Sequence, residues 1–151
     1  MARRRAPQVY VFRAKLVAVK GVRRRVALRG DQTLADLHLA LQDAFEWDDD
    51  HLYAFWLDGE YWSHQAIEFS HPAHARELRS DPETRSAAVR LGDLALEPGQ
   101  KIAYVFDFGG EWRVELTVAG VVADDGGAYP RLLESTGEAP PQYPQLEEDV
   151  A

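Results

Sequence analysis

Cysteine is absent from the 151 residues of the chain, and methionine occurs once. The absence of cysteine excludes disulfide bonds, thiol catalysis and thiolate metal sites. The chain has no apolar run near the length that spans a bilayer. No apolar segment follows the arginines of the N-terminal MARRRAPQ, so we expect no signal peptide. We therefore expect a cytoplasmic protein with no metal and no cofactor.

Acidic residues are absent from the first 30 positions, which hold ten Lys or Arg and carry a formal charge of +10. Residues 31–151 hold the other seven basic residues and all 25 acidic ones, which gives −18 and a total of −8. Such asymmetry is found where a basic end contacts nucleic acid. It is also found where basic strands fold against acidic ones. We favour the second interpretation, because the overall charge repels phosphate.

The chain does contain enough apolar side chains for one packed domain. Hydrophobic residues make up 46% of it, with four Trp, six Tyr and six Phe. We expect a single domain over residues 9–143, preceded by a disordered basic lead-in at 1–8. Residues 144–151 are expected to form a disordered acidic tail.

One helix is the centre of the expected fold, over Leu34–Glu46. Thr33 is its expected N-cap, and Asp36 occupies the acidic position of a capping box. Three consecutive aspartates after the helix end it, because negative charge is unfavourable at the negative end of the helix dipole. His51–Leu57 is apolar on both faces, which predicts an interior strand. The helix places these apolar residues on one face: Leu34, Leu37, Leu41, Ala44 and Phe45.

Two hairpins are expected on either side of this helix in the sequence. Val9–Val19 and Val22–Arg29 form the first, and Arg24 interrupts the apolar face of its second strand, so we expect that strand to start exposed. Lys101–Val122 forms the second hairpin. A three-residue loop at its tip, Gly109 to Glu111, places core residues opposite one another and sets Asp107 opposite Arg113.

The rest of the chain has weaker patterns. Ser63–Ser86 is irregular, with faint strand character at Ala66–Phe69 only, and predicts a surface excursion. Val89–Leu94 indicates a helical turn. Beyond Ala123 we expect an irregular tail.

Several segments in this order and spacing resemble the plasmid pRiA Orf-three-like family. They are Arg23–Val26, Thr33–Phe55, Leu91–Leu94, Tyr104–Leu116 and Tyr129–Arg131. The resemblance covers about Val9 to Pro141 and implies a compact α+β domain related to the β-grasp arrangement, with extra strands. The activity of that family is not established, so the resemblance implies no catalytic residues.

Two departures from the family pattern affect possible sites. Members often carry a C-terminal cysteine–proline–proline–acid stretch, which reads Ala139-Pro140-Pro141-Gln142 here. A metal or thiol role at that place is therefore not implied for this chain. The aspartate that is usual in the hairpin loop is also replaced, leaving Gly109 to Glu111.

Candidate binding residues come from polar clusters and exposed aromatic residues. The sequence Asp48 to His51 offers an acid or base, but adjacent carboxylates chelate poorly and suit a turn in which an aspartate pairs with His51. His64, His71 and His74 lack the spacing of a known zinc site. We expect the binding surface to draw on Asp48, Asp50, His51, Trp62, Asp107, Arg113, Tyr129 and Arg131.

The first hairpin offers a second kind of surface. Arg23 and Arg25 point to one face of their strand and Arg24 to the other. Arg13 and Lys15 on the neighbouring strand extend that face into a basic stripe suited to phosphates. Aromatic residues that could stack on bases are limited to Tyr10 and Phe12 on this hairpin.

These observations predict an α+β, β-grasp-like mixed sheet with one main helix packed on it and an added C-terminal hairpin. We expect a non-enzymatic binding or adaptor module with a protein partner and no contact with membrane. Two alternatives stay open. One is a hydrolase-like enzyme that uses Asp48 to His51 with Asp107, and the other is a nucleic-acid binder through Arg13, Lys15, Arg23 and Arg25.

Overall fold

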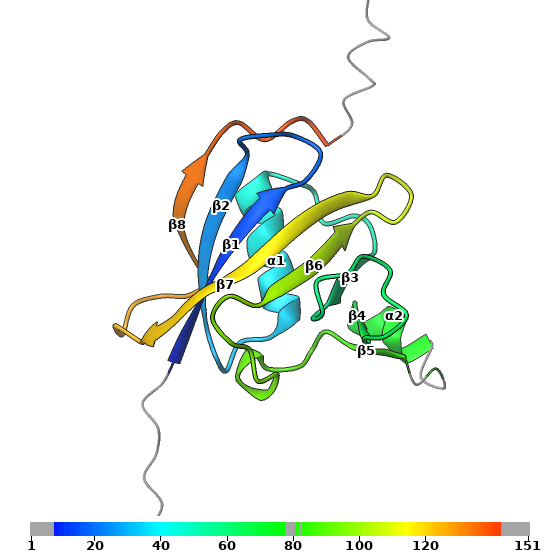
Figure 1. The fold of residues 1–151 in the computed structure, drawn as a ribbon, viewed down its shortest axis with the longest axis horizontal. Helices are drawn as coiled ribbons and strands as arrows, with labels where there is room; N and C mark the ends of the chain where they lie inside the picture. The colour runs from blue at the N-terminus through cyan, green and yellow to red at the C-terminus, as the bar shows by residue number, and fades with distance from the viewer. Residues whose placement is uncertain (1–7, 78–80, 82, 143–151) are drawn as a thin grey trace, which may run out of the picture.

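The computed structural model describes residues 8–77, 81 and 83–142. The acidic tail expected at 144–151 lies outside these residues, as does the expected lead-in except for Gln8, which begins the first strand. Figure 1 shows one sheet with a long helix against it. In chain order the elements are β1 (Gln8–Leu16), β2 (Arg23–Arg29), α1 (Leu34–Phe45), β3 (Tyr53–Trp56), β4 (Glu68–Ser70), α2 (Pro72–Glu77), β5 (Thr84–Ser86), the 3-10 helix η1 (Leu91–Asp93), β6 (Lys101–Phe106), β7 (Trp112–Ala123) and β8 (Arg131–Thr136).

The described strands form one mixed sheet of eight strands in the order β5-β4-β3-β6-β7-β1-β2-β8. Every neighbouring pair is antiparallel except β4 with β5. This confirms the expected mixed sheet with one main helix. The predicted second hairpin is not an addition at one side, because β6 and β7 lie at the centre of the sheet and β7 pairs with β1. The relation to the β-grasp arrangement remains an expectation.

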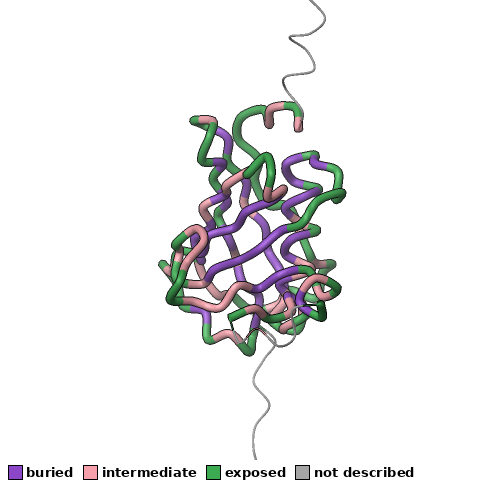
Figure 2. Tube along the Cα trace, turned by 90° about the vertical axis from the view of Figure 1, so that its right-hand side faces the viewer, coloured by how far each residue is buried: buried purple, intermediate pink, exposed green. Residues whose placement is uncertain are grey.

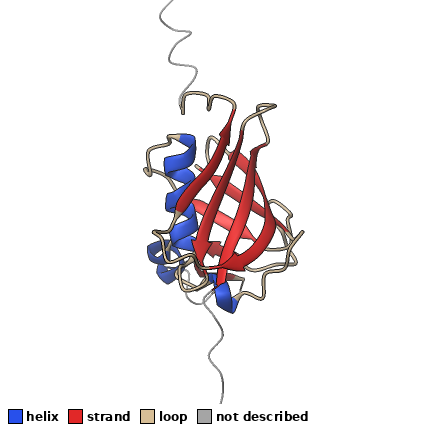
Figure 3. Cartoon of the chain, turned by 90° about the vertical axis from the view of Figure 1, so that its left-hand side faces the viewer, coloured by secondary structure: helices blue, strands red, loops and turns tan. Residues whose placement is uncertain are grey.

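Helix α1 lies along one face of the sheet, while no described helix covers the opposite face of β7, β1 and β2 (Figure 3). The expected capping box is present: Thr33 accepts from the amide of Asp36, whose carboxylate accepts from the amide of Thr33. Glu46 ends the helix in the left-handed conformation, with φ of 59°. None of the described helices is long and apolar enough to cross a membrane.

The main core fills the space between α1 and the sheet. Figure 2 shows buried stretches running along the central strands and the helix. The side chains that face the helix include Phe12, Leu28, Phe55 and Tyr104, all fully buried. Tyr10 and Phe12, the aromatic residues of the first hairpin, belong to this core and not to an exposed face.

A smaller apolar cluster lies on the opposite face of the sheet, over β3 and β6. Residues 58–66, which we call the strap, cross this face and pack Tyr61 and Trp62 onto Ala54, Trp56, Ala103 and Val105. Gly59 begins the strap with φ of 79°, and a Cβ there would lie 3.0 Å from the Cβ of Lys101. The turn at Asp58-Gly59 therefore needs glycine both for its backbone conformation and for its close approach to β6.

The tip of the β6–β7 hairpin differs from the prediction by a shift of two residues. Phe106 pairs with Trp112 and Val105 with Arg113, so the loop spans five residues and Asp107 does not face Arg113. Asp107 is left-handed, with φ of 64°, and its carboxylate accepts from the amide of Gly110. A shift of two residues keeps every side chain on its expected face, so the alternation alone could not detect it.

Three other expectations need correction. The tail contains a strand, β8, which pairs with β2 at the edge of the sheet. The excursion at 63–86 is partly regular, because it forms β4, α2 and β5. Arg24 is only 5% exposed, so the start of β2 is buried on the face of Arg24 and exposed only on the face of Arg23.

The helical turn expected near Val89–Leu94 is confirmed as η1.

Candidate functional site

The uncovered part of the sheet carries a shallow groove of about 420 Å³, which we call the basic groove. The register of β1 and β2 places Arg13 opposite Arg25 and Lys15 opposite Arg23. The structure therefore brings the four basic residues predicted for this hairpin to one face. The groove is lined on this face by Arg13, Lys15, Arg23, Arg25, Lys101, Glu115, Thr117, Glu134 and Thr136.

The groove has more positive than negative side chains, although the chain is acidic overall. Five cations face two carboxylates, a formal balance of +3, against −8 for the whole chain. Glu115 accepts a hydrogen bond from Lys101 at 2.9 Å. The carboxylate of Glu134 lies 3.8 Å from Nε of Arg25. This nitrogen atom is buried and has no hydrogen-bond partner in the described structure. Like charges directly opposite on neighbouring strands repel one another, and the carboxylates of Glu115, opposite Lys15, and Glu134, opposite Arg25, offset only part of this positive charge.

Arg24, between the two groove arginines of β2, points to the helix side. Its Nε donates to the carbonyl of Ala44 at 2.8 Å, and its Nη1 donates to the carbonyl of Thr136 at 2.8 Å. The guanidinium also lies 5.3 Å from the ring centre of Phe45. The carbonyl of Ala44 belongs to the last turn of α1, at the negative end of the helix dipole, where a cation is favourable. Arg24 therefore links the end of the helix to the edge strand β8.

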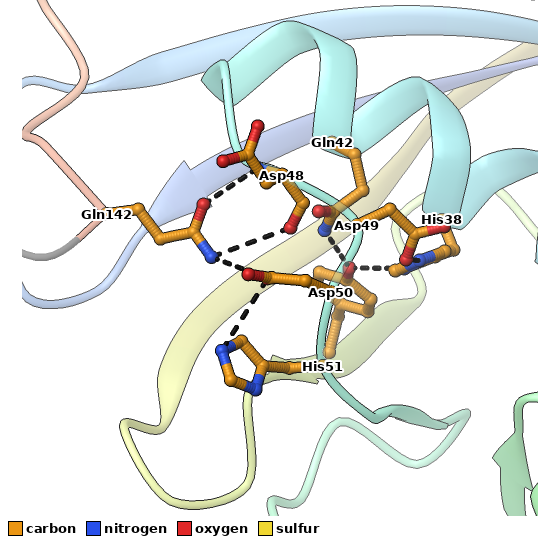
Figure 4. A network of polar contacts seen from close by, with 8 residues as sticks. His38, Gln42, Asp48, Asp49, Asp50, His51 and Gln142 are labelled. Atoms are coloured by element: carbon orange, nitrogen blue, oxygen red, sulfur yellow. Dashed lines mark hydrogen bonds and ion pairs between the residues drawn. The ribbon is translucent and has the colours of Figure 1, made fainter.

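A chain of polar groups on the helix side of the sheet links three buried side chains to the exposed Asp49 (Figure 4). Nε2 of Gln42 is 3.0 Å from the hydroxyl of Tyr104, which is 2.7 Å from Nδ1 of His38. Nε2 of His38 is 2.7 Å from Oδ1 of Asp49. A carboxylate can only accept, so Nε2 carries the proton and Nδ1 of the neutral ring accepts from the Tyr104 hydroxyl. We call these four residues the His38 network.

Burial favours the neutral forms of His38 and Tyr104. It lowers the pKa of His38, although the nearby Asp49 carboxylate acts in the opposite direction. Burial likewise raises the pKa of Tyr104 well above its usual value. The order carboxylate, imidazole and hydroxyl matches that of a catalytic triad. The hydroxyl belongs to a fully buried residue, however, so it cannot reach a substrate. The network instead joins α1 to β6 and to the three aspartates at positions 48 to 50, which we call the acidic turn.

The acidic turn brings several predicted residues together (Figure 4). The amide of Asp48 donates to Oε1 of Gln142 at 2.7 Å, and Nε2 of Gln142 donates to Asp50 at 3.0 Å. Nε2 of His51 lies 3.6 Å from Asp50 and 3.7 Å from Asp107. The pairing of an aspartate with His51 was predicted, whereas the contact with Gln142 was not. An imidazole between two carboxylates is a setting for a general acid or base, so the enzyme alternative stays a prediction.

Beside this turn is an open depression of about 610 Å³. His71 and His74 of the excursion line it, but His64 does not. No three His, Cys, Asp or Glu side chains of the described residues are arranged to hold a metal ion. The lining residues are Asp49, Asp50, His51, Leu52, His71, Ala73, His74 and Glu77.

The remaining predicted residues lie elsewhere. Trp62 is half-buried in the strap, and its indole N–H donates to Glu111 at 3.1 Å. Arg113 lies on the groove side of the sheet. Tyr129 and Arg131 lie at the other end of α1, where the Tyr129 carbonyl accepts from Gln32. The predicted binding residues therefore do not form one surface.

Arg131 forms an exposed ion pair with Asp125, with two hydrogen bonds of 2.8 and 3.0 Å. These bonds, with one from the amide of Gly127, hold the pKa of Asp125 well below its usual range. The guanidinium of Arg131 also lies 4.2 Å from the ring centre of Tyr129. Both predicted residues at this end are thus engaged in local contacts.

Sequence reasoning missed several residues of these sites. His38 occupies a helix position beside the apolar face, and Tyr104 alternates with core residues, so both resembled ordinary core positions. Lys101 and Tyr61 reach the groove side only through the pairing of β6 with β7 and the path of the strap. Gln142 is 92 residues from Asp50 in the chain. No local pattern indicates a contact over that separation.

Comparison with known proteins supports the fold and leaves the activity unassigned. The chain is 30% identical over 122 residues to the uncharacterized protein y4hQ of Sinorhizobium fredii (strain NBRC 101917 / NGR234). That match covers 80% of this chain, and the chain spans 58% of the length of y4hQ.

A crystal structure of a protein of unknown function, MM3350 from Methanosarcina mazei Go1, has the same fold. The two superimpose with a TM-score of 0.72 at 19% identity, over 97% of this chain and 83% of that one. A family model for the plasmid pRiA4b ORF-3-like protein matches residues 8–143, which is nearly all of the chain. The chain therefore belongs to the plasmid pRiA4b ORF-3-like family.

Proposed function

We propose that this protein is a non-enzymatic binding module whose basic groove binds a phosphate-bearing polyanion. The observation that carries the proposal is the excess of positive charge in the groove, where the strand register sets Arg13 opposite Arg25 and Lys15 opposite Arg23. Natural sheets more often place opposite charges or uncharged residues at such positions. A bound polyanion would neutralise the four cations and remove the repulsion between them.

The negative charge of the whole chain does not oppose this binding at close range. Electrostatic interactions between exposed charges are screened beyond a Debye length of about 8 Å at physiological ionic strength. A phosphate in the groove is therefore affected mainly by the side chains that line it, where the balance is +3. The acidic surfaces elsewhere reduce the rate of approach more than the strength of the contact.

The types of side chain also favour phosphate. Three of the five cations are arginines, and the planar guanidinium can donate two parallel hydrogen bonds to phosphate oxygens. Arg13, Lys15 and Arg23 are exposed and Arg25 is half-buried, so these groups can be reached from solvent. The hydroxyls of Thr117 and Thr136, at the floor and edge, can donate further hydrogen bonds.

Titration calorimetry with inorganic polyphosphate tests the proposal. We expect binding by the wild-type protein, at least about tenfold weaker binding by the double variant Arg13→Gln with Arg25→Gln, and loss of affinity as salt rises. Arg90→Gln, with Arg90 exposed beside the start of α1, removes one charge away from the groove and should bind as the wild type does. Absence of binding, or equal binding by the double variant, would refute the proposal.

The expected protein partner is a separate outcome of this experiment. A second titration uses polyglutamate of matched charge, which carries carboxylates in place of phosphates. If polyglutamate binds more tightly than polyphosphate and loses affinity in the same double variant, the groove is a site for an acidic protein segment. The depression beside the acidic turn stays a candidate contact for a protein partner.

A hydrolase-like activity is the second candidate, and His51 between Asp50 and Asp107 is the observation that favours it. It predicts turnover of a generic ester or phosphodiester that disappears when Asp50 and His51 are both replaced by Ala. The non-enzymatic proposal predicts that no such turnover is found with either protein.

A further inference from the structure

Arg113 and Tyr61 form a stacked pair beside the basic groove, and we call them the rim pair. Arg113 projects from β7 on the same face as Glu115, a groove residue two positions further along the strand. Two residues of a strand span about 7 Å, so the rim pair is one side-chain width from the groove. The guanidinium of Arg113 lies 4.8 Å from the ring centre of Tyr61.

The rim pair is held in place from two directions. The strap packs Tyr61 against the small apolar cluster on β3 and β6. Glu111 accepts from Nε of Arg113 at 2.6 Å through one carboxylate oxygen and from the indole of Trp62 at 3.1 Å through the other. The side chain of Arg113 nevertheless remains 40% exposed. Its guanidinium is therefore a fixed planar group that covers a tyrosine on one side and is accessible on another.

We propose that the polyanion is a single-stranded nucleic acid, with phosphates in the basic groove and a base stacked on the guanidinium of Arg113. This inference rests on the proposed function, because the groove must first bind phosphates. Bases of single strands stack on aromatic side chains and on arginine planes, whereas the bases of a duplex are already stacked on each other. The rim pair supplies the planar surface that the first hairpin lacks, since Tyr10 and Phe12 are buried in the core.

The test compares three ligands that carry the same number of phosphates and differ in whether they offer unstacked bases. Fluorescence anisotropy would measure binding of a labelled single-stranded 12-mer of mixed sequence, an abasic 12-mer with the same phosphates, and a duplex with the same number of phosphates. We expect the 12-mer with bases to bind about fivefold or more tightly than the abasic strand. Stacking of one base on a protein side chain is worth enough to produce such a ratio.

Arg113→Lys separates stacking from charge, because lysine keeps the positive charge and loses the planar group. We expect this variant to bind the two 12-mers about equally and to bind polyphosphate as the wild type does. Arg90→Gln is the matched control and should keep the preference for bases. Tyr61→Leu, checked for folding by circular dichroism, should reduce the same preference by removing the support under the guanidinium.

The outcomes distinguish this inference from the proposed function. If polyphosphate binds but the strands with and without bases bind equally, or the duplex binds best, the inference is wrong and the basic groove remains a phosphate site. If the preference for bases survives in Arg113→Lys, the rim pair is not the stacking surface and the inference is wrong. If polyphosphate and both strands all fail to bind, the proposed function and the inference are overturned together.

Discussion

The His38 network and the basic groove lie on opposite faces of one sheet and contain polar groups in opposite arrangements. In the network, His38 has a partner at each ring nitrogen, Asp49 on one side and the Tyr104 hydroxyl on the other. In the groove, Arg13 faces Arg25 and Lys15 faces Arg23. Buried polar groups must be satisfied within the fold, while exposed like charges can be stabilised by a ligand.

The comparison between the His38 network and the basic groove indicates which of the two is the better candidate for a functional site. A buried histidine and tyrosine in line with an aspartate suggest catalysis, but their hydrogen bonds join α1, β6 and the acidic turn. The groove has two exposed ion pairs, Lys101 with Glu115 and Arg25 with Glu134, and an excess of positive charge that they do not neutralise. An exposed surface with unneutralised charge is the better candidate for binding, because folding does not require that charge.

The largest expected effect comes from Arg24, the buried neighbour of two groove arginines. Arg24→Gln should lower the free energy of unfolding by about 3 kcal/mol, because hydrogen bonds to a charged group are lost and the carbonyls of Ala44 and Thr136 lose their donor. Urea denaturation measures the change. Arg23→Gln is the matched control on the adjacent residue and should change stability by less than about 0.5 kcal/mol. Similar losses in the two variants would contradict the assignment of Arg24 to the fold.

Tyr104→Phe should have the next largest effect, a loss of about 2 kcal/mol, because it leaves Nδ1 of His38 and Nε2 of Gln42 buried without a partner. Denaturation with urea again gives the value. Tyr129→Phe removes a hydroxyl that donates to Asp125 at the surface, and its cost should be only a few tenths of a kcal/mol. A Tyr104→Phe protein as stable as the wild type would show that the network does not hold the fold together.

Acid should weaken the fold through His38. Desolvation lowers the pKa of His38 in the folded protein below its ordinary value of 6.5, so the unfolded chain binds more protons as the pH falls through 6.5. The free energy of unfolding therefore decreases on acidification below about pH 6.5 and stops decreasing, for this group, below the folded pKa. The groups facing His38 are Asp49, Tyr104, Tyr53 and His71.

Denaturation curves between pH 5 and 8 would measure this dependence. His38→Gln should remove part of the slope of stability against pH. His64→Gln, at an exposed position, should retain the slope of the wild type. An unchanged slope in His38→Gln would show that other groups cause the acid sensitivity.

The smallest expected effect is in the groove itself. The double variant Arg13→Gln with Arg25→Gln should be as stable as the wild type or more stable by a few tenths of a kcal/mol, because it removes a like-charge cross-strand pair and loses only the exposed, 3.8 Å ion pair of Arg25 with Glu134. The gain should disappear at about 1 M salt, where the Debye length is about 3 Å. A clear loss of stability at low salt would mean that these arginines serve the fold, and it would remove the contrast between the two faces.

Much of the fold could be predicted from local patterns. The capping box of Thr33 and Asp36 and the end of the helix at Glu46 follow from side chains within a few residues of each other. Alternation placed Arg23 and Arg25 on one face of β2 and Arg24 on the other. These features depend on backbone geometry over short separations, which a sequence displays directly.

The features that were missed depend on long separations. Strand β8 has mostly exposed side chains, so it lacks the apolar alternation that marks a half-buried strand. Its position is decided by hydrogen bonds to β2, a hundred residues earlier in the chain. The register of β6 with β7 was wrong by two residues because the period of a strand does not distinguish such shifts.

By itself, the sequence determined the main helix, most strands and the side of each strand on which the basic residues lie, since these follow from the periods of helix and strand. Only the tertiary structure decided that Arg24 is buried, that Gln142 bonds to the acidic turn, that Lys101 joins the first hairpin in the groove and that Arg113 lies over Tyr61. The physical reason is that burial and contact depend on which distant segments pack together. Packing is set by the whole core, and local periodicity does not record it.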